Sequence, residues 1–513
     1  RGNMSEISSK RQVAKNAIML YIRMIFTMFV GLYSSRVVLQ TLGVTDYGVY
    51  NVVAAVVPFF GFFSNSMAAS TSRFLTLELG RGEKKRLQKT FSSALIIQLG
   101  VALSMILLAE TVGLWFLFNM LKIPAERFNT AFWVYQISAF SVLFDCTQVP
   151  YNACIIAHEK MNVYAYVEIL KTILKLLILY LLIIGKFDKL LLYAILSFLV
   201  GVIITLIYRI YCIRNFEECR FEFKVDKDII KPMLSFSGFD TFTGLCANVN
   251  FQGIPYFINI VFSVILNAAA GIVLTVTNVF RSFVGNITTA FRPQIIKLYA
   301  QEKYKEMIDI YYLSLRMLIF IMSVVIIIFI YNCNYILELW LGNVPAYTVI
   351  LLDICFFEVF FDVITSNLKI GIHAAGKIRK YSVSQGVVKL MVIPLAILCL
   401  LVAKKPEHIY IINTLSTFIC MVLSVYYLKE NIPYFSIRDF IFYLGSMILP
   451  IVPTVVILLF LNELRLSDSV SLLSSSGVIL VCMTLFSYIF LGYKNRQVVN
   501  TIVKNKLFKK FNS

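Results

Sequence analysis

The chain is a long succession of apolar runs, each about 20 residues long and bounded by charged residues, proline or glycine. A helix of that length crosses the hydrocarbon core of a bilayer, about 30 Å thick. Backbone N–H and C=O groups at that depth must be satisfied within the segment, which restricts such runs to helices. We therefore predict an all-α polytopic membrane protein with about 14 transmembrane helices. The predicted spans lie near residues 13–40, 46–72, 90–118, 128–157, 161–184, 189–212, 230–256, 267–297, 308–332, 346–373, 379–403, 409–428, 439–462 and 470–493.

The composition excludes several other classes. With 59% hydrophobic and only 15% charged residues, 513 residues cannot form a water-soluble globule. The net charge of +19 comes from basic residues in short loops, so no nucleic-acid partner is predicted. The ten cysteines form no CxxC pair and the three histidines lie far apart, so we predict no metal site and no cofactor. No connection exceeds about 20 residues and no GxxxxGK[ST] motif occurs, so we predict no soluble catalytic domain and no ATP hydrolysis by this chain alone.

The distribution of basic residues predicts the topology. If the N-terminus is cytoplasmic, the cytoplasmic segments hold about 28 Lys and Arg, and the opposite loops hold about 7. This bias is typical of short cytoplasmic loops. We predict that both termini are cytoplasmic.

A weak internal repeat relates the two halves of the chain. A shift of about 219 positions places Arg73 on Arg292, and a shift of about 217 places Lys160 on Lys377. Six spans in each half, both starting inside, predict parallel repeats around a pseudo-twofold axis along the membrane normal. The predicted division is a first lobe over 1–213, a second over 214–430, two further helices over 431–493 and a basic cytoplasmic tail over 494–513.

A motif follows the first span. It reads LGVTDYGVY from Leu42 to Tyr50, after Arg36, and a helix further on ends in SRFLTLELG before a basic loop. This pattern resembles the polysaccharide and O-antigen flippases of the multidrug and oligosaccharidyl-lipid exporter superfamily, and the similarity in span count covers essentially the whole chain. The residues that carry the motif are Arg36, Gly43, Asp46, Gly48, Tyr50, Arg73 and Gly80. One departure is the cluster of phenylalanines from Phe59 to Phe63, where peptidoglycan-precursor flippases carry arginines.

The resemblance implies an alternating-access transporter of the bacterial inner membrane. Its substrate would be an undecaprenyl-pyrophosphate-linked oligosaccharide, an O-antigen or capsule repeat unit, moved from the cytoplasmic to the periplasmic leaflet. The expected partners are this substrate, membrane lipids, and a polysaccharide polymerase with its chain-length regulator, and the expected state is a monomer. One alternative is a multidrug exporter of the same superfamily, with cationic substrates and an acidic cavity. A membrane-embedded sugar polymerase or glycosyltransferase is a third interpretation, disfavoured by the short outer loops.

Charges inside the spans are costly, so they should face protein or water rather than lipid. Cations there could neutralise a pyrophosphate head group, and the same side chains could instead pair with nearby acids or reach the interface. The candidate substrate-binding cations are Arg281, Arg23, Lys171, Lys175 and Arg36.

Acidic residues within the spans are candidates for coupling to H⁺ or Na⁺, because neutralisation removes the cost of moving a carboxylate through a dry state. Each could equally be a structural partner of an arginine. The candidates are Asp240, Asp145, Glu358 and Asp362.

Overall fold

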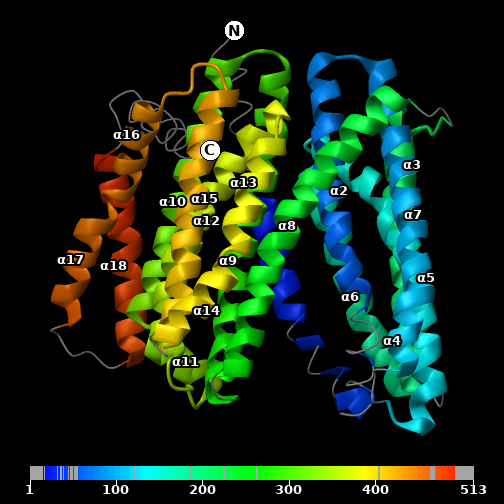
Figure 1. Ribbon diagram of the computed structural model, residues 1–513, viewed down its shortest axis with the longest axis horizontal. Coiled ribbons are helices and arrows are strands. Elements are labelled where there is room, and N and C mark those ends of the chain that lie inside the picture. The colour runs from blue at the N-terminus through cyan, green and yellow to red at the C-terminus, as the bar shows by residue number, and fades with distance from the viewer. Residues whose placement is uncertain are drawn as a thin grey trace, which may run out of the picture. The chain divides into compact units, whose positions relative to one another are not determined.

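The computed structural model is mostly helical in the part of the chain that it describes (Figure 1). That part comprises residues 16, 18–31, 33–34, 37–38, 40–43, 46, 50, 56–119, 123–184, 188–222, 226–261, 264–402, 405–462 and 468–490. The predicted all-α class is confirmed for these residues. Arg36 and Gly48, named in the sequence analysis, lie outside them.

The first half of the chain forms mostly long helices. They are a helix over 18–31, α2 (Val56–Arg81), α3 (Lys84–Leu108), the π-helix η1 (Ala109–Gly113), α4 (Leu114–Asn119), the 3₁₀ turn η2 (Ala125–Arg127), α5 (Phe128–Ala157), α6 (Met161–Ile184), α7 (Lys189–Asn215), the 3₁₀ turn η3 (Glu217–Cys219) and α8 (Lys227–Val261).

The second half continues in the same way. Its helices are α9 (Val264–Ala300), α10 (Tyr304–Tyr331), α11 (Cys333–Leu341), α12 (Thr348–Ala375), α13 (Arg379–Leu390), α14 (Val392–Val402), α15 (Glu407–Asn431), α16 (Ile437–Ile448), α17 (Ile451–Asn462) and α18 (Asp468–Ile489).

Each predicted span overlaps helices of the structure, and most described ends differ by a few residues. The exception is the span predicted to end at residue 72, because α2 continues to Arg81. Eight helical stretches of the described part are long and apolar enough to cross a membrane. The total of about 14 spans remains a prediction. Two predicted spans are interrupted near proline. Pro394 and Pro453 have no N–H to donate to the carbonyls four residues earlier, and the chain breaks between α13 and α14 and between α16 and α17.

Spatially the described residues form two compact units. Unit 1 contains those up to Cys246, together with 289–303 and 373–386. Unit 2 contains 247–288, 304–372 and those from Val387 onward. Both α8 and α9 therefore contribute one end to each unit. The lobes predicted from the repeat are continuous segments of the sequence, unlike these units, and they remain predictions.

The helix ends agree with the repeat. A shift of about 219 carries the end of α2 at Arg81 onto the end of α9 at Ala300. A shift of about 217 carries Glu159 onto Gly376, and these two residues have positive φ angles of 59° and 80°. The corresponding helices thus end in turns of the same kind.

Arg73 stabilises the turn at the end of α12. Its Nε donates a hydrogen bond to the carbonyl of His373, and its Nη2 donates to the carbonyl of Ala374 at 3.2 Å. These carbonyls belong to the last turn of α12, where no intrahelical partner exists and a positive charge is favourable. A Cβ at Gly376 would overlap the guanidinium. Arg73, read from sequence as part of the motif, thus caps α12 within unit 1.

Candidate functional site

Unit 2 contains a buried group of opposite charges, which we call the pairing centre: Arg281 of α9 with Glu358 and Asp362 of α12. The Arg281 Nη2 lies 2.6 Å from Glu358 Oε2, and its Nη1 lies 3.0 Å from Asp362 Oδ2. The two acids are four residues apart, so they share one face of α12 and meet the same guanidinium. The structure thus brings together one predicted substrate-binding cation and two predicted coupling acids.

Neighbouring polar groups hold Glu358 in place. Thr417 of α15 donates its hydroxyl to Glu358 Oε1 at 3.2 Å, and Lys389 of α13 donates to Thr417 Oγ1 at 2.6 Å. Phe251 of α8 covers the guanidinium of Arg281, whose Cζ lies 5.0 Å from the ring centroid. Such a cation–π contact favours the charged form of the arginine inside a span.

The two carboxylates differ in exposure. The Glu358 side chain is 5% exposed, whereas that of Asp362 is 29% exposed. A group that exchanges an ion during transport must meet water at some stage, while a fixed counter-ion need not. This difference makes Asp362 the better coupling candidate and Glu358 the constant partner of Arg281.

A small cavity adjoins the pairing centre. Its volume is about 30 Å³, and it is lined by Arg281 and Glu358 together with Phe251, Thr277, Tyr410 and Asn413. A water molecule needs roughly 10–15 Å³ on this measure, whereas sites for drug-sized ligands measure about 300–1,000 Å³. The cavity can admit water or a small cation, and it is too small for an organic substrate.

Arg281 is therefore not an unpaired cation. An anionic substrate that bound its guanidinium would have to displace Glu358 or Asp362 and leave that carboxylate without its partner. The role of Arg281 in substrate binding remains a prediction, as do the roles assigned to the other candidate residues.

Unit 1 holds a second group of charges, spread along α6, α5 and the first helix. Asp145 of α5 interacts electrostatically with Glu168, Lys171 and Lys175 of α6. Arg23 lies over the ring of Tyr164, with its Cζ 4.9 Å from the centroid. The group, which we call the α6 charge group, contains three cations and two acids and has a net charge of +1 if all ionise. The lysines thus act electrostatically on Asp145 within a group of positive excess, and their pairing with an acid remains a prediction.

Asp240 occupies a different environment in unit 1. Ser66 of α2 donates its hydroxyl to Asp240 Oδ2 at 3.3 Å, and His373 Nε2 lies 3.4 Å from Oδ1. The side chain is 8% exposed. These contacts tie the first half of α8 to α2 and to the end of α12, which is also where Arg73 binds. A structural role explains them without an exchanged ion.

The described motif residues also make packing contacts. Asp46 lies 2.5 Å from Arg127 Nη2, and Arg127 Nη1 lies 2.8 Å from Asp188, which caps the start of α7. Tyr50 packs edge-on against Tyr193, with ring centroids 5.0 Å apart. Gly43 has a φ of 80°, which suits glycine. A Cβ at Gly80 would lie 2.8 Å from the Cβ of Ala300, so glycine permits α2 and α9 to touch.

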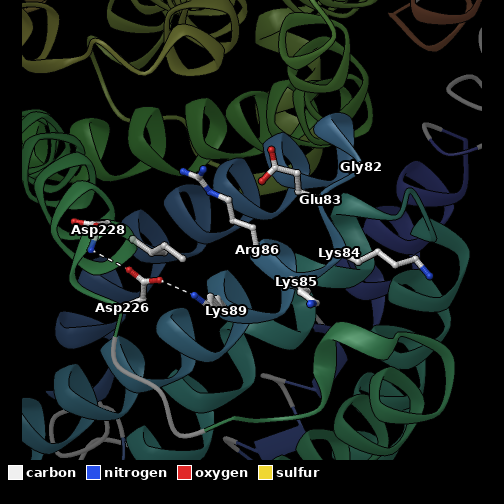
Figure 2. A pocket seen from close by; sticks show the side chains of 9 residues that line it. Gly82, Glu83, Lys84, Lys85, Arg86, Lys89, Asp226 and Asp228 are labelled. Carbon is white, nitrogen blue, oxygen red and sulfur yellow. Dashed lines mark hydrogen bonds and ion pairs between the residues drawn. The ribbon is translucent and has the colours of Figure 1, made fainter.

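A basic hollow lies at the start of α3. Figure 2 shows Lys84, Lys85, Arg86 and Lys89 around it, with Asp226 and Asp228 on one side. Its volume is about 750 Å³. Lys89 Nζ lies 3.3 Å from Asp226 Oδ2, and Lys84 Nζ lies 3.1 Å from Glu217 Oε2. The hollow lies in a loop predicted to be cytoplasmic, where basic residues are expected.

Comparison with solved structures identifies proteins that share the fold of this chain. No protein-family model and no curated protein matches the chain. Solved structures do match, with 82–83% of this chain covered in the three that follow. The first is a MOP superfamily transporter from Pyrococcus furiosus, with a TM-score of 0.70, 11% identity and 95% of that chain covered. The second is an outward-facing multidrug resistance MATE family transporter, with a TM-score of 0.71, 11% identity and 95% of that chain covered. The third is a mutant Vibrio cholerae MATE transporter, with a TM-score of 0.66, 12% identity and 98% of that chain covered. The chain has the fold of MOP superfamily transporters.

This likeness concerns the fold, and the matching structures named above are MATE and other MOP transporters. The Pyrococcus furiosus transporter is described as having a binding pocket of reverse polarity that suggests a different function. Polarity can therefore differ among proteins with this fold, and the substrate must be argued from the charges of the chain itself.

Proposed function

We propose that this chain is a multi-pass membrane exporter that couples the efflux of an amphipathic organic compound to the entry of H⁺ or Na⁺ at the pairing centre. The observations that carry the proposal are that Glu358 and Asp362 share the guanidinium of Arg281, and that a cavity of ion size is lined by Arg281 and Glu358. When one of two carboxylates that share an arginine binds an ion, it no longer needs the arginine, which then pairs with the other carboxylate alone. Ion binding thus changes the contacts between the helices, as a coupling site requires.

In this mechanism Asp362 takes up the cation, because its side chain is the more exposed of the two acids. Arg281 then stays with Glu358, which Thr417 also holds. Binding the cation weakens the contact between α9 and α12 and lowers the cost of moving the carboxylate through a dry state. Release of the cation on the other side restores the contact.

The proposed substrate class is an amphipathic, preferably cationic compound. The solved structures with this fold include multidrug resistance transporters, and two acids face Arg281 at the pairing centre, with Lys389 one hydrogen bond farther away through Thr417. At 10–12% identity the likeness concerns the fold alone, so the substrate class is inferred from the charges.

The lipid-linked oligosaccharide flippase is the second candidate, and one observation favours it. The α6 charge group has a positive excess, and a lipid-linked pyrophosphate carries about two negative charges that Arg23, Lys171 and Lys175 would attract. The LGVTDYGVY motif agrees with this candidate. For either substrate we propose a bacterial inner-membrane protein with cytoplasmic termini, and for the flippase a polymerase and a chain-length regulator as partners.

Two assays on one set of variants distinguish the candidates. The first measures resistance to a panel of lipophilic cations in a strain that lacks its own exporters. The second measures surface polysaccharide in a flippase-deficient strain. We expect the wild type to raise resistance, and the Asp362→Asn protein at matched expression not to do so. Restored polysaccharide without resistance would establish the flippase instead, and failure of both assays would contradict the proposed exporter.

For the flippase, a matched pair tests the α6 charge group. Lys171→Gln with Lys175→Gln should abolish complementation, because the local charge falls from +1 to −1. The paired change Lys84→Gln and Lys85→Gln removes the same charge from the basic hollow and should have a smaller effect. Equal complementation by both variants would rule out the α6 charge group as the anion site.

A further inference from the structure

Four side chains with metal-ligating atoms meet in unit 1, outside the sites described above. Cys154 lies in the last turn of α5 and His158 directly follows that helix, while Glu218 and Cys219 belong to η3. The Sγ atoms of Cys154 and Cys219 are 3.5 Å apart, and Cys154 Sγ lies 3.5 Å from Glu218 Oε1. His158 Nε2 lies 2.5 Å from the same Glu218 oxygen.

These distances suit a tetrahedral metal ion. With zinc–sulfur bonds of about 2.3 Å, two thiolates of one tetrahedral site lie about 3.8 Å apart, and a thiolate and a carboxylate oxygen lie about 3.6 Å apart. The two observed separations that involve sulfur are within a few tenths of an ångström of these values. The ligand atoms of Cys154, His158 and Glu218 lie within 4.8 Å of one another, whereas Cys219 contacts this group through Cys154. To complete a tetrahedral site, the contact between His158 and Glu218 must lengthen by about 1 Å and the Cys219 sulfur must move toward these two residues.

Most side chains of this cluster are buried, and the His158 ring is held in a fixed orientation. Cys154 and Cys219 are each 1% exposed, so few other ligands can reach their sulfur atoms. The imidazole of His158 stacks on Phe216 at a centroid distance of 4.1 Å and an interplanar angle of 12°, which fixes the ring orientation. Cys212 places a third buried thiol nearby, with its Sγ 3.6 Å from the carbonyl of Tyr151. The partly exposed edge of His158 offers a path for entry.

We propose that Cys154, Cys219, His158 and Glu218 form a structural site for a soft divalent cation, Zn²⁺ in the first place. Two thiolates with an imidazole and a carboxylate select zinc over Mg²⁺ or Ca²⁺, which prefer oxygen ligands. Zinc binds the two cysteines as thiolates, so metal binding releases the two thiol protons.

The site would act on the connection between α7 and α8. The turn η3 lies in that connection, which joins the two predicted lobes, and all four ligands come from only two short segments. A metal held by both segments would fasten η3 to the end of α5. The contact of Gln88 with the carbonyl of Arg220 already places this connection against α3. The metal therefore stabilises the segment through which the repeats are joined.

The test uses the full-length protein, purified in detergent under reducing conditions without a polyhistidine tag. After incubation with ZnCl₂ and removal of free metal, we expect about one zinc per chain by mass spectrometry. Cobalt(II) should give the visible bands and the thiolate charge-transfer absorption of a tetrahedral site. Absence of both signals in the wild type would overturn the proposal. So would a disulfide between Cys154 and Cys219 in the reduced preparation, found by peptide mapping.

A set of variants identifies the ligands. Cys154→Ala with Cys219→Ala should lose the zinc and the cobalt bands, and His158→Gln should weaken them. Cys246→Ala, which removes another buried thiol of unit 1, should retain both. A full zinc content in the double variant would overturn the assignment. Because the wild-type measurement stands by itself, a double variant that fails to fold does not remove the test.

Discussion

The Arg281→Ala protein is expected to lose export and to lose about 3–5 kcal/mol of stability, because the buried Glu358 and the partly buried Asp362 are left without their cation. Arg281→Glu should be worse, since a third negative charge joins Glu358 and Asp362. Arg281→Lys should retain part of both properties, because one ammonium cannot hold two carboxylates in the way that a guanidinium does. The measurements are thermal unfolding of the purified protein and export at matched expression.

Neutralising the two acids of the pairing centre should rescue the stability of the Arg281→Ala protein. Adding Glu358→Gln and Asp362→Asn to Arg281→Ala removes the uncompensated charge and should restore most of the lost stability, while export stays absent. Arg438→Ala, an exposed arginine at the start of α16, serves as the control and should change neither property. Full export by the Arg281→Glu protein would show that the pairing centre has no part in transport.

The second large effect concerns the cap that Arg73 forms on α12. Arg73→Ala removes two hydrogen bonds from a charged donor and leaves buried carbonyls unsatisfied, so it should destabilise the protein by about 3 kcal/mol. It also removes the contacts of the guanidinium with the rings of Phe74 and Phe236, at 4.9 and 5.1 Å. Arg73→Lys should recover little, because its single ammonium cannot reach both carbonyls with the geometry of the fork.

Two glycines separate the effect of the Arg73 contact from that of backbone strain. Gly376 and Gly82 have φ angles of 80° and 77°, so alanine costs about 1–2 kcal/mol of backbone strain at either one. Only at Gly376 would the new Cβ also meet the guanidinium of Arg73, whereas the space around Gly82 is open. Gly376→Ala should therefore destabilise by about 2 kcal/mol more than Gly82→Ala, and this excess should vanish when Arg73 is also alanine. Equal effects of the two glycine changes would contradict the capping role of Arg73.

The sequence predicts the helices well where charge and local breakers mark their ends. The predicted span 128–157 coincides with α5 and 161–184 with α6, because the polar run at 158–160 separates them. The breaks beside α14 and α17 are harder to place, because a proline in an apolar run can either bend a helix or end it. The short helix α11 is not predicted, because nine residues are too few for a span.

The site was predicted less completely than the fold. The sequence identifies Arg281, Glu358 and Asp362 as charges inside spans, but their pairing joins residues 77 and 81 positions apart on two helices. Without contacts, each residue could serve a substrate, an ion or a partner. The cluster around Cys154 and His158 was not anticipated. Their spacing of four residues at a helix end was the one available signal, while Glu218 and Cys219 join them only through the fold.

Ion movement coupled to export in liposomes is the measurement that tests the proposed mechanism most directly. The purified protein would be reconstituted with a pH-sensitive or sodium-sensitive dye, and the compound that scored in the resistance or complementation assay would be added. We predict that substrate drives H⁺ or Na⁺ across the membrane in the wild type, and that Asp362→Asn lowers this flux on the order of 100-fold while substrate still binds. Asp353→Asn, on the same helix outside the pairing centre, should retain the flux. An undiminished flux in the Asp362→Asn protein, or wild-type export that survives collapse of both ion gradients, would contradict coupling at the pairing centre.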